Sequence, residues 1–204
     1  FEWKEMSRYG ISYEFVRNLL LRFAQIRDFN SADGLIFLTK YAEQSVVPFL
    51  SRRQKHAAII PHGIDPIFRK KPKKQLAIDK YSADRPFSIL YVSIVDVYKH
   101  QWNVIEAVGR LRKRGRPVEL KLVGPSYGPA LIRMQDAIKR MDGAESFVRY
   151  VGEKAKTELV GLYHSADMFV FASSCENLPN IMIEAMAAGL PIASSERGPM
   201  PEVL

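Results

Sequence analysis

The apolar residues from Pro86 onward alternate between two kinds of spacing. Short unbroken apolar runs are typical of strands that a parallel sheet buries on both faces, and five such runs occur. Between them, apolar residues recur every three or four positions, which is the spacing of one face of a helix. Strands and helices that alternate with short connections predict right-handed crossovers and a doubly wound parallel sheet, an α/β fold. The predicted strands are Ser88–Val92, Val118–Val123, Phe147–Val151, Met168–Ala172 and Leu190–Ser194.

Three helices between these strands have apolar faces that can be read directly. We expect Thr157 to cap the third helix, and Pro179 to occupy the first position of a fourth, where its missing N–H removes no hydrogen bond. Small residues behind the fourth helix, up to Gly189, favour close packing of that helix on the sheet. The three faces consist of Val104, Ala107, Val108 and Leu111, of Leu131, Met134, Ile138 and Met141, and of Leu159, Leu162, Tyr163 and Ala166.

The first 65 residues have a different pattern. One long helix is predicted from Ser12 to about Asn30, followed by a strand at Leu35–Thr39, a helix at Lys40–Leu50 and a strand at Ala57–Ile60. Such a piece is too small to bury a good sheet by itself. We therefore expect it to be the end of a preceding domain.

A polar stretch punctuated by proline, Arg69–Pro86, separates the two patterns and predicts a linker. We expect residues 1–66 to be the C-terminal part of an N-terminal domain, 67–86 to be the linker, and 87–204 to be a ligand-binding domain. The opening residues FEWKEMSRYG have neither an initiator Met nor the order of a signal peptide, and the sequence stops abruptly after GPMPEVL. We expect a fragment of a longer protein, truncated at the C-terminus of its second domain.

Composition and charge narrow the choice of partner. The 204 residues are 47% hydrophobic and 25% charged, a globular balance that argues against disorder. The net charge is +8, and basic residues gather at Arg69–Lys74, at Arg110–Arg116, and at Arg52, Arg53 and Lys55. The cluster at Arg110–Arg116 fits the dipole of a helix C-terminus, and no nucleic-acid motif accompanies any of the three clusters. The sequence argues against a nucleic-acid partner and keeps an anionic membrane surface as a candidate.

Two glutamates, Glu176 and Glu184, flank the start of the fourth helix with seven residues between them. The strand that ends at Ala172 delivers their segment, SSCENLPNIMIEAMAAG, to the carboxyl edge of the sheet, where such folds bind ligands. N–H groups without helical partners around Asn180–Ile183 would form an anion site. Carboxylates on either side of a phosphate suit hydroxyl groups, which is the layout of a nucleotide sugar. The alternative is a solvated Glu176 and a Glu184 that interacts only with the helix dipole.

Lys99 follows the first strand of the second domain and is expected at the same edge. Its ammonium group could neutralise phosphate charge there, and the alternative is a solvent-facing loop lysine. Cys175 is the only cysteine and has no base near it in sequence, so it predicts neither an intrachain disulfide nor catalysis. The histidines lack the spacing of metal ligands, so we predict no metal and no cofactor. These histidines are His56, His62, His100 and His164.

Five segments taken together resemble a known family. They are AIIPHGIDPIF, ILYVSIVDVYKHQWNVIEAVGRL, LKLVGPSY, VRYVGEKAKTELVGLYHSADMFVFASSCENLPNIMIEAMAAGLPIASS and GPMPEVL. In this order they are similar to group 1 glycosyltransferases (glycosyltransferase family 4), whose GT-B fold has two Rossmann-like domains. The resemblance covers Ala58–Leu204, and the first 57 residues more loosely. It implies retaining transfer of a hexose-type sugar from a nucleoside-diphosphate sugar to an acceptor hydroxyl, without a metal.

The resemblance also implies roles for individual residues. Glu176 would face the hydroxyls of the donor sugar, Glu184 would face the ribose, and Lys99 would hold the diphosphate. Glu176 and Lys99 are the expected catalytic residues. The other residues expected to bind the donor are Asn177, Leu178, Pro179, Asn180 and Ile181 around sugar and phosphate, Val151 and Gly152 near the base, and Ser93 and Gly124 at strand ends. The residues expected beside the acceptor cleft, in the PHGID segment where the chain crosses between domains, are His62, Gly63 and Asp65.

The family pattern is matched incompletely. The Gly-Arg pair that usually follows the first strand is Ser93-Ile94 here, so one phosphate-binding cation is missing. His100, His62 and Asn177 stand where the family has Gly, Asn and Gly. We expect His100 or a residue outside this chain to supply the second positive contact. The acceptor-side histidine of the family also lies outside this chain, so the chain alone is expected to be inactive.

The leading hypothesis is a cytoplasmic sugar transferase, peripheral on the inner face of the cytoplasmic membrane, that assembles cell-surface polysaccharide or lipopolysaccharide. Its partners would be a UDP-, GDP- or ADP-sugar and a glycan or lipid-linked acceptor. Ile94 favours a second hypothesis, a non-catalytic nucleotide-sugar-binding or scaffold subunit of the same pathway. Charge alone favours a basic nucleic-acid or membrane-binding module, and the shared architecture leaves open a phosphorylase or a sugar-nucleotide epimerase.

Overall fold

The structure is a computed structural model that describes residues 6–10, 12–51, 56–143 and 146–204. The chain divides into two compact units. Unit 1 contains the chain up to Gly63, together with residues 174–179 and 196–204, and unit 2 contains Ile64–Ser173 and Asn180–Ser195. The first change of unit falls inside the PHGID segment. The three-part division at residues 66 and 86 stays a prediction.

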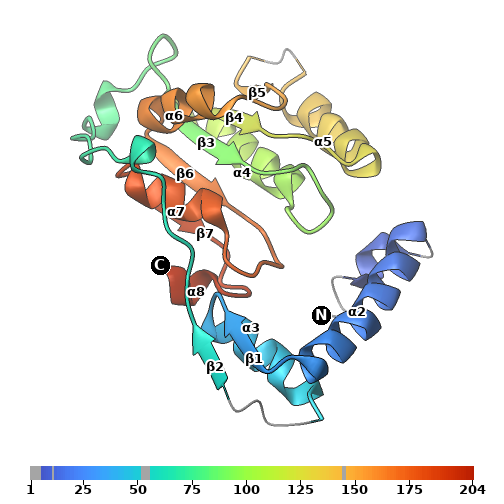
Figure 1. Cartoon of the computed structure of the whole chain (residues 1–204). Coiled ribbons are helices and arrows are strands. Elements are labelled where there is room, and N and C mark those ends of the chain that lie inside the picture. Colours follow the sequence, from blue (N-terminus) through green and yellow to red (C-terminus); the bar gives the residue numbers. More distant parts are fainter. Residues whose placement is uncertain (1–5, 11, 52–55, 144–145) are drawn as a thin grey trace. The chain divides into compact units, whose positions relative to one another are not determined.

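Unit 2 is built on a parallel sheet. Its strands are β3 (Phe87–Val92), β4 (Val118–Val123), β5 (Val148–Tyr150), β6 (Met168–Phe171) and β7 (Ile192–Ser194). The five strands lie in the order β5-β4-β3-β6-β7 (Figure 1). β3 pairs with β4 along its whole length, from Phe87 opposite Val118 to Val92 opposite Val123. All the pairings in this sheet are parallel, so the predicted α/β fold is confirmed.

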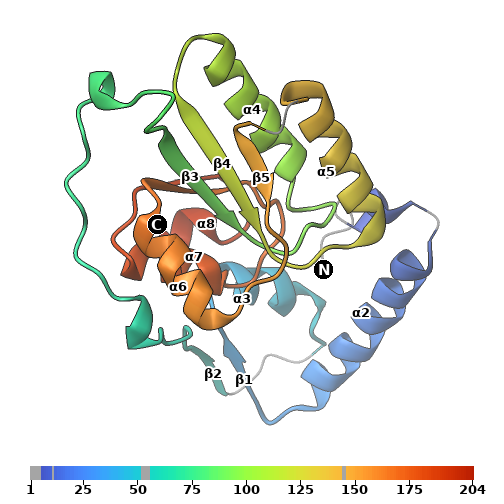
Figure 2. The same ribbon diagram turned by 90° about the horizontal axis from the view of Figure 1, so that it is seen from above.

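Helices cover both faces of this sheet. They are α4 (Gln101–Lys113), α5 (Gly128–Met141), α6 (Lys156–Ser165) and α7 (Asn180–Ala187). α4 and α5 pack against each other on one face, while α6 and α7 lie on the other face (Figures 1 and 2). The chain winds from β3 outward to β5 and then crosses back to β6, so right-handed crossovers place the later helices on the opposite face. This is a doubly wound arrangement.

Apolar side chains between sheet and helices form the core of unit 2. Ile105 of α4, Leu120 of β4, Met134 of α5 and Phe169 of β6 are completely buried. The buried residues of α4 and α5 recur at the three- and four-residue spacing on which their prediction rested. The hydrophobic pattern therefore located the core helices correctly.

The polar stretch predicted as a linker belongs to unit 2 and follows its surface. Two short 3-10 helices lie at its start and within it, η3 (Pro66–Phe68) and η4 (Ile78–Lys80). The backbone N–H of Lys70 donates to the carbonyl of Ala187, the last residue of α7, at 2.9 Å. Gly189 has φ +69°, and a Cβ there would lie 2.7 Å from the backbone nitrogen of Pro72. Gly189 therefore makes room for the linker, and its part in close packing of the helix on the sheet stays a prediction.

Unit 1 contains a long helix and a two-stranded parallel sheet. Its elements are η1 (Ser7–Tyr9), α2 (Tyr13–Ser31), β1 (Gly34–Phe37), α3 (Lys40–Val46), η2 (Val47–Phe49), β2 (His56–Ile59) and α8 (Met200–Val203). The side chain of Ser12 caps α2 by accepting from the N–H of Phe15 at 3.3 Å. The Glu202 carboxylate accepts from the N–H groups of Lys40 at 2.6 Å and Tyr41 at 2.9 Å, so it satisfies donors that the start of α3 leaves without helical partners.

Some boundaries differ from the sequence-based expectation. The strand predicted at Leu35–Thr39 ends at Phe37, because Thr39 instead caps α3 by accepting from the N–H of Ala42 at 3.0 Å. The helix predicted to run to Leu50 ends at Val46 and tightens into η2, which contains Pro48 and its missing N–H. The strands predicted at Phe147–Val151 and Leu190–Ser194 are each two residues shorter.

Two predicted helix starts also shift by about one turn or less. Thr157 is the second residue of α6, which begins at Lys156, so the prediction that Thr157 caps this helix is wrong. Pro179 directly precedes α7 instead of opening it.

The basic residues Arg52, Arg53 and Lys55 lie outside the described residues. Among the residues that the structure describes, none of the helices combines the length and the apolar character that a bilayer crossing requires.

Candidate active site

The carboxyl edge of the unit 2 sheet collects most of the predicted donor-binding residues. β3 and β6 are neighbours at the centre of the sheet, and the winding direction of the chain reverses between them. In doubly wound sheets, the loops that leave two such strands open a crevice in which ligands bind. The segment after β3 leads to Lys99, and the segment after β6 leads to α7.

Lys99 is buried at this edge, with 5% of its surface exposed. Its ammonium nitrogen lies 5.1 Å from the ring centroid of Phe171, the last residue of β6, and 4.9 Å from the ring of Tyr98. The buried hydroxyl of Tyr91 on β3 donates to the Lys99 carbonyl and so fixes the backbone of the loop. A lysine is seldom buried to this extent unless a negative partner is held nearby, so the alternative of a solvent-facing loop lysine is wrong.

The backbone around Ser93 and Ile94 is held by side-chain donors. The carbonyl of Ile94 accepts from the hydroxyl of Ser93 at 3.0 Å and from the side-chain amide of Gln101 at 2.8 Å. Ser93 is buried, and its N–H donates to the carbonyl of Val123 on β4 at 2.8 Å. The Ile94 side chain is 37% exposed and apolar, so this position supplies no charge to an anion.

The loops that follow β4 and β5 meet the loop after β3. Gly124 has φ +136°, and a Cβ there would lie 2.2 Å from the carbonyl oxygen of Ser93. Its N–H donates to the carbonyl of Gly152 at 2.8 Å, and its carbonyl accepts from the hydroxyl of Tyr150 at 2.8 Å. The N–H of Val151 donates to β4 at 3.0 Å, to the carbonyl of Leu122. The structure therefore brings Ser93, Gly124 and Gly152 together, and their binding of one ligand stays a prediction.

Glu184 lies in the second turn of α7 and is half-buried. One of its carboxylate oxygens accepts a hydrogen bond from the hydroxyl of Tyr163, at 2.9 Å. Burial raises the pKa of Glu184, while that hydrogen bond and the charge of Lys156 oppose the rise. The alternative, a glutamate that interacts only with the helix dipole, does not account for the buried tyrosine that orients it. A carboxylate oriented in this way can accept hydroxyl groups with its remaining lone pairs.

Glu176 lies in the loop of residues 174–179, which belongs to unit 1. The hydroxyl of Thr39, which is almost fully buried, donates to the carbonyl of Asn177 at 3.2 Å. Gly198 has φ +59°, and a Cβ there would lie 3.7 Å from the backbone nitrogen of Glu176. Glu176 itself is half-buried, Asn177 is exposed, and Pro179 is buried. Contacts on both sides therefore determine the path of this loop. Among the other predicted donor-binding residues, Leu178 and Ile181 are partly buried and Asn180 is exposed.

The predicted acceptor-side residues divide between the two units. His62 and Gly63 are exposed at the end of the first segment of unit 1. Asp65 is in unit 2, where it accepts from the N–H of Ile67 at 3.0 Å and pairs with the ammonium group of Lys156. The hydrogen bond from Ile67 and the one from Lys156 lower the pKa of Asp65. Asp65 therefore anchors the start of unit 2 to α6.

His100 has the only left-handed backbone conformation of a non-glycine residue in the described chain, with φ +55°. It stands immediately before α4, and its ring meets that of Trp102 edge to face at 5.7 Å. The resemblance predicts a glycine at this position, and a left-handed turn costs backbone strain when a histidine adopts it. Whether His100 replaces the missing arginine stays a prediction.

Sequence reasoning missed the residues that orient the site. The sequence pattern placed Tyr163 only on an apolar helix face. A buried tyrosine hydroxyl usually needs a hydrogen-bond partner, and that requirement could have pointed to a polar contact of Tyr163. Thr39 and Glu202 gave no signal, because their partners lie more than 130 residues away. Within the described part of the chain, no group of three or more potential metal-binding residues is found.

The family follows from a comparison with known proteins. The model of the family described as "Glycosyl transferases group 1" matches residues 86–204, more than half of the chain. The chain belongs to this family. The resemblance seen in the five sequence segments is confirmed.

This group 1 glycosyltransferase spans less than half the length of the curated relatives compared. It is 32% identical over 126 residues to the amylovoran biosynthesis glycosyltransferase AmsK of Erwinia amylovora, an alignment that covers 59% of this chain and 30% of the relative. It is 24% identical over 201 residues to a D-inositol 3-phosphate glycosyltransferase of Arthrobacter sp. (strain FB24), which covers 90% of this chain and 47% of the relative.

Solved structures show the same fold. The HepE protein of Anabaena, in complex with UDP and glucose, superposes with a TM-score of 0.74 at 19% identity, covering 98% of this chain and 53% of that one. The pneumococcal O-GlcNAc transferase GtfA, in complex with UDP and GlcNAc, gives a TM-score of 0.65 at 20% identity, covering 87% and 33%. The predicted GT-B type of α/β fold is confirmed by this likeness.

Proposed function

We propose that this chain carries the donor site of a retaining glycosyltransferase. The whole protein would move a hexose-type sugar from a UDP-, GDP- or ADP-sugar to a glycan or lipid-linked acceptor during the synthesis of cell-surface polysaccharide or lipopolysaccharide. It would act in the cytoplasm, at the inner face of the cytoplasmic membrane. Relatives named for the biosynthesis of amylovoran and colanic acid support the pathway, and neighbours solved with UDP and sugars support the donor class.

One observation carries the proposal: Lys99 is a buried cation at the point where a doubly wound sheet opens its ligand crevice. Its ammonium group lies against Phe171 at the end of β6, and the Tyr91 hydroxyl fixes its backbone. An ammonium group held at this position can bind the negative charge of a diphosphate at the carboxyl edge.

Charge development gives Lys99 its role in the reaction. As the bond between the sugar and the diphosphate breaks, negative charge grows on the leaving diphosphate. A cation held in place before the reaction stabilises that charge more in the transition state than in the ground state. The N–H groups at the start of α7 would act on the same charge. Loss of one such contact typically lowers the rate on the order of 10²–10³-fold.

The two glutamates would bind hydroxyl groups on either side of the diphosphate. Glu184, oriented by Tyr163, would accept from the ribose, and Glu176 would accept from the donor sugar. The site would need neither a metal nor a cofactor, because cationic and N–H donors would carry the phosphate charge. Ile94 stands where an arginine was expected, and His100 or a residue outside this chain would supply that second positive charge.

Donor binding tests the assignment directly. We expect a UDP-, GDP- or ADP-sugar to raise the melting temperature of the chain, because a ligand that binds only the folded state stabilises it. Lys99→Ala and Glu184→Ala should abolish the shift. Lys139 and Asp136, two exposed residues of α5, provide charge-matched controls. The Lys139→Ala and Asp136→Ala variants should keep the shift in melting temperature. An unchanged shift in both site variants would show that the donor binds elsewhere.

The exposed apolar side chain of Ile94 favours a second candidate, a nucleotide-sugar-binding or scaffold subunit of the same pathway. Without a second cation the leaving group would be poorly stabilised even if the donor bound. Sugar transfer to a lipid-linked acceptor, measured with the whole protein as the cell makes it, separates the two functions. Turnover supports the transferase, and donor binding without turnover supports the scaffold.

A further inference from the structure

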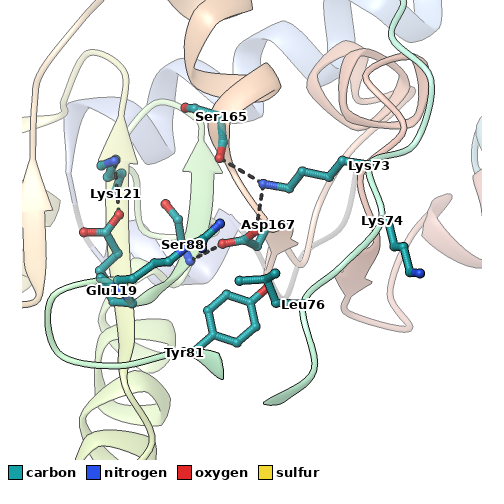
Figure 3. A pocket seen from close by; sticks show the side chains of 11 residues that line it. Lys73, Lys74, Leu76, Tyr81, Ser88, Glu119, Lys121, Ser165 and Asp167 are labelled. Carbon is teal, nitrogen blue, oxygen red and sulfur yellow. Dashed lines mark hydrogen bonds and ion pairs between the residues drawn. The ribbon is translucent and has the colours of Figure 1, made fainter. Parts of the chain in front are cut away.

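A charged hollow lies at the amino-terminal edge of the unit 2 sheet, opposite the edge that carries Lys99, and we call it the amino-edge pocket. Its volume is about 290 Å³, and its charged lining consists of Lys73, Lys74, Arg85, Lys121, Glu119 and Asp167. Ser88 near the start of β3 and Glu119 near the start of β4 place it at the end of the strands away from Lys99 (Figure 3). The volume is near the lower end of the range for small-molecule pockets, about 300–1,000 Å³.

The linker builds one wall of the pocket and is held there by hydrogen bonds. The side-chain amide of Gln75 donates to the carbonyl of Asp167 at 2.9 Å, and the hydroxyl of Tyr81 donates to Gln75 at 3.0 Å. The ring of Tyr81 meets Phe87 edge to face at 5.2 Å. The ammonium group of Lys73 donates to the carbonyl of Ser165 at 3.1 Å. The wall is therefore anchored to the sheet and to the end of α6.

Both carboxylates of the pocket are already occupied. Asp167 pairs with Lys73 at 2.7 Å through one oxygen and accepts from the N–H of Ser88 at 2.8 Å through the other. Glu119 pairs with Lys121 at 3.1 Å. Figure 3 shows Lys73 turned toward Asp167 and Lys121 turned toward Glu119. Within each pair the two charges cancel, so neither carboxylate of the lining is left to neutralise the remaining cations of the pocket.

The remaining cations are Arg85 and Lys74. Among the described residues, no acceptor is found for either side chain. Lys74 extends along the rim, away from the Lys73–Asp167 pair, and its four rotatable bonds let the ammonium group swing back over the mouth (Figure 3). Four cations against two carboxylates leave a surplus of two positive charges in the pocket.

The surrounding surface has the same sign of charge. Five of the six residues from Arg69 to Lys74 and five of the seven from Arg110 to Arg116 are basic. Arg112 and Arg116 line a neighbouring hollow that shares Tyr81 with the amino-edge pocket. Basic residues around a concave site focus the electrostatic field and raise the local concentration of anions.

We propose that the amino-edge pocket binds a phosphate group with two negative charges, carried either by a soluble phosphate monoester or by a lipid headgroup. The planar guanidinium of Arg85 matches two phosphate oxygens, and Lys74 and the Ser88 hydroxyl supply further donors. The two positive charges in excess match the two charges of a phosphate monoester. This site is separate from the donor site and does not depend on the proposed function.

Titration of the ¹⁵N-labelled chain with inorganic phosphate, at neutral pH and at an ionic strength kept constant with chloride, tests the proposal. We expect saturable shifts of the Leu76, Ser88 and Asp167 amide signals. The double variant Lys74→Gln/Arg85→Gln should weaken binding by roughly tenfold or more, because two charge-assisted hydrogen bonds are lost. The variant with charges removed from two other exposed sites, Lys113→Gln/Lys139→Gln, should change it less than about twofold.

Lys99→Ala separates the two sites. It should remove the phosphate-induced shifts of amide signals at the carboxyl edge and leave the shift of the Ser88 amide signal unchanged. Vesicles of phosphatidylcholine with phosphatidic acid, a phosphomonoester lipid, identify the source. If the native chain binds these vesicles and the Lys74→Gln/Arg85→Gln variant does not, the ligand is a lipid headgroup. If the native chain binds phosphate saturably but does not bind the vesicles, the ligand is a soluble ester. The proposal is overturned if Ser88 and Asp167 show no saturable response. It is also overturned if both double variants weaken binding equally, because charge alone would then explain it.

Discussion

The hydroxyl of Tyr163 lies 2.9 Å from a carboxylate oxygen of Glu184 and 3.2 Å from the carbonyl oxygen of Ile181. Tyr163 is on α6 and both acceptors are on α7, so one buried hydroxyl joins the two helices and orients the carboxylate. Burial, and next the negative charge of Glu184, raise the pKa of this tyrosine well above its usual range. The hydroxyl therefore stays protonated and acts as a donor.

Tyr163→Phe should weaken donor binding without emptying the site. We expect donor affinity to fall about fivefold, because Glu184 keeps its charge and loses its orientation, and the free energy of unfolding to fall by about 1–2 kcal/mol. Calorimetric titration and urea unfolding measure the two effects. Tyr81→Phe is the matched control, since it removes a tyrosine hydroxyl bonded to Gln75 at the opposite edge. Equal loss of donor affinity in both variants would contradict an orienting role for Tyr163.

Donor binding should decline on acidification at a higher pH than an ordinary glutamate would produce. Burial raises the pKa of Glu184, and the ionised form is the better acceptor for a hydroxyl, so affinity is complete above the raised pKa and is lost as the pH falls through it. Tyr163→Phe should move this loss to still higher pH, because the hydrogen bond from Tyr163 opposes the rise. Glu184→Gln should bind weakly at all pH values, and an unchanged pH profile in that variant would assign the titration to another group.

The effect of Glu184 on folding has the opposite sign. Its pKa is higher in the folded than in the unfolded chain, so ionisation above the ordinary glutamate pKa lowers stability and protonation relieves that cost. Glu184→Gln should therefore raise the midpoint of urea unfolding at neutral pH. Such a residue is typical of a binding site, where stability is sacrificed for function.

The sequence predicted the parts of this fold that depend on local patterns. Alternating apolar runs gave the strands and core helices of unit 2, since burial on both faces of a parallel sheet leaves a direct trace in the sequence. The position of Lys99 could be predicted because it follows a strand, whereas its burial could not. Phe171, whose ring lies beside the ammonium group, is 72 positions away in sequence and comes close through the pairing of β3 with β6.

Long-range contacts explain the remaining differences. Gly189 looked like a residue for helix–sheet packing, but the backbone that comes close to it is that of Pro72, over 110 positions earlier. The Arg69–Pro86 stretch has the composition of a flexible linker, yet Gln75 and Tyr81 anchor it by single hydrogen bonds to residues that composition cannot identify. The amino-edge pocket was missed for the same reason.

Asp142 should contribute most of its stabilisation through hydrogen bonds to the start of β5. Its nearly buried carboxylate accepts from the N–H groups of Ser146 at 2.9 Å, Phe147 at 2.7 Å and Val148 at 2.7 Å. Asp142→Asn replaces one acceptor oxygen by a donor, so we expect a loss of about 2–3 kcal/mol in the free energy of unfolding at neutral pH. Urea unfolding measures it, with the exposed Asp136→Asn as the control.

The pH dependence gives Asp142 a second test. Burial acts to raise the pKa of Asp142, but the hydrogen bonds to its carboxylate outweigh burial and lower it. Its contribution is therefore complete above the unfolded-state pKa and is lost as the pH falls through the lower folded-state pKa. The difference in stability between the native chain and Asp142→Asn should shrink across that acidic range. A constant difference would mean that the carboxylate charge has no part in it.

Gly124→Ala should disrupt the carboxyl edge. A Cβ at this position would lie 2.2 Å from the carbonyl oxygen of Ser93, and φ +136° is a conformation that alanine rarely adopts. We expect the free energy of unfolding to fall by at least about 3 kcal/mol and donor binding to be lost with it. Gly128→Ala is the control, because no neighbouring atom lies within 4 Å of a Cβ there. If both variants were equally stable, the close approach of Gly124 to Ser93 would not exist in solution.

His100 allows strain and side-chain function to be measured separately. Its backbone is left-handed, with φ +55°, and its ring contacts Trp102 at 5.7 Å. His100→Ala removes the ring and keeps the strain, whereas His100→Gly removes both, so we expect the glycine variant to be more stable than the alanine variant by about 1 kcal/mol in urea unfolding. If His100 also contacts the donor phosphates, both variants should bind the donor equally weakly despite their different stabilities. If donor affinity followed stability, or if neither variant lost affinity, His100 would not be the missing cation. A residue outside this chain would then have to supply it.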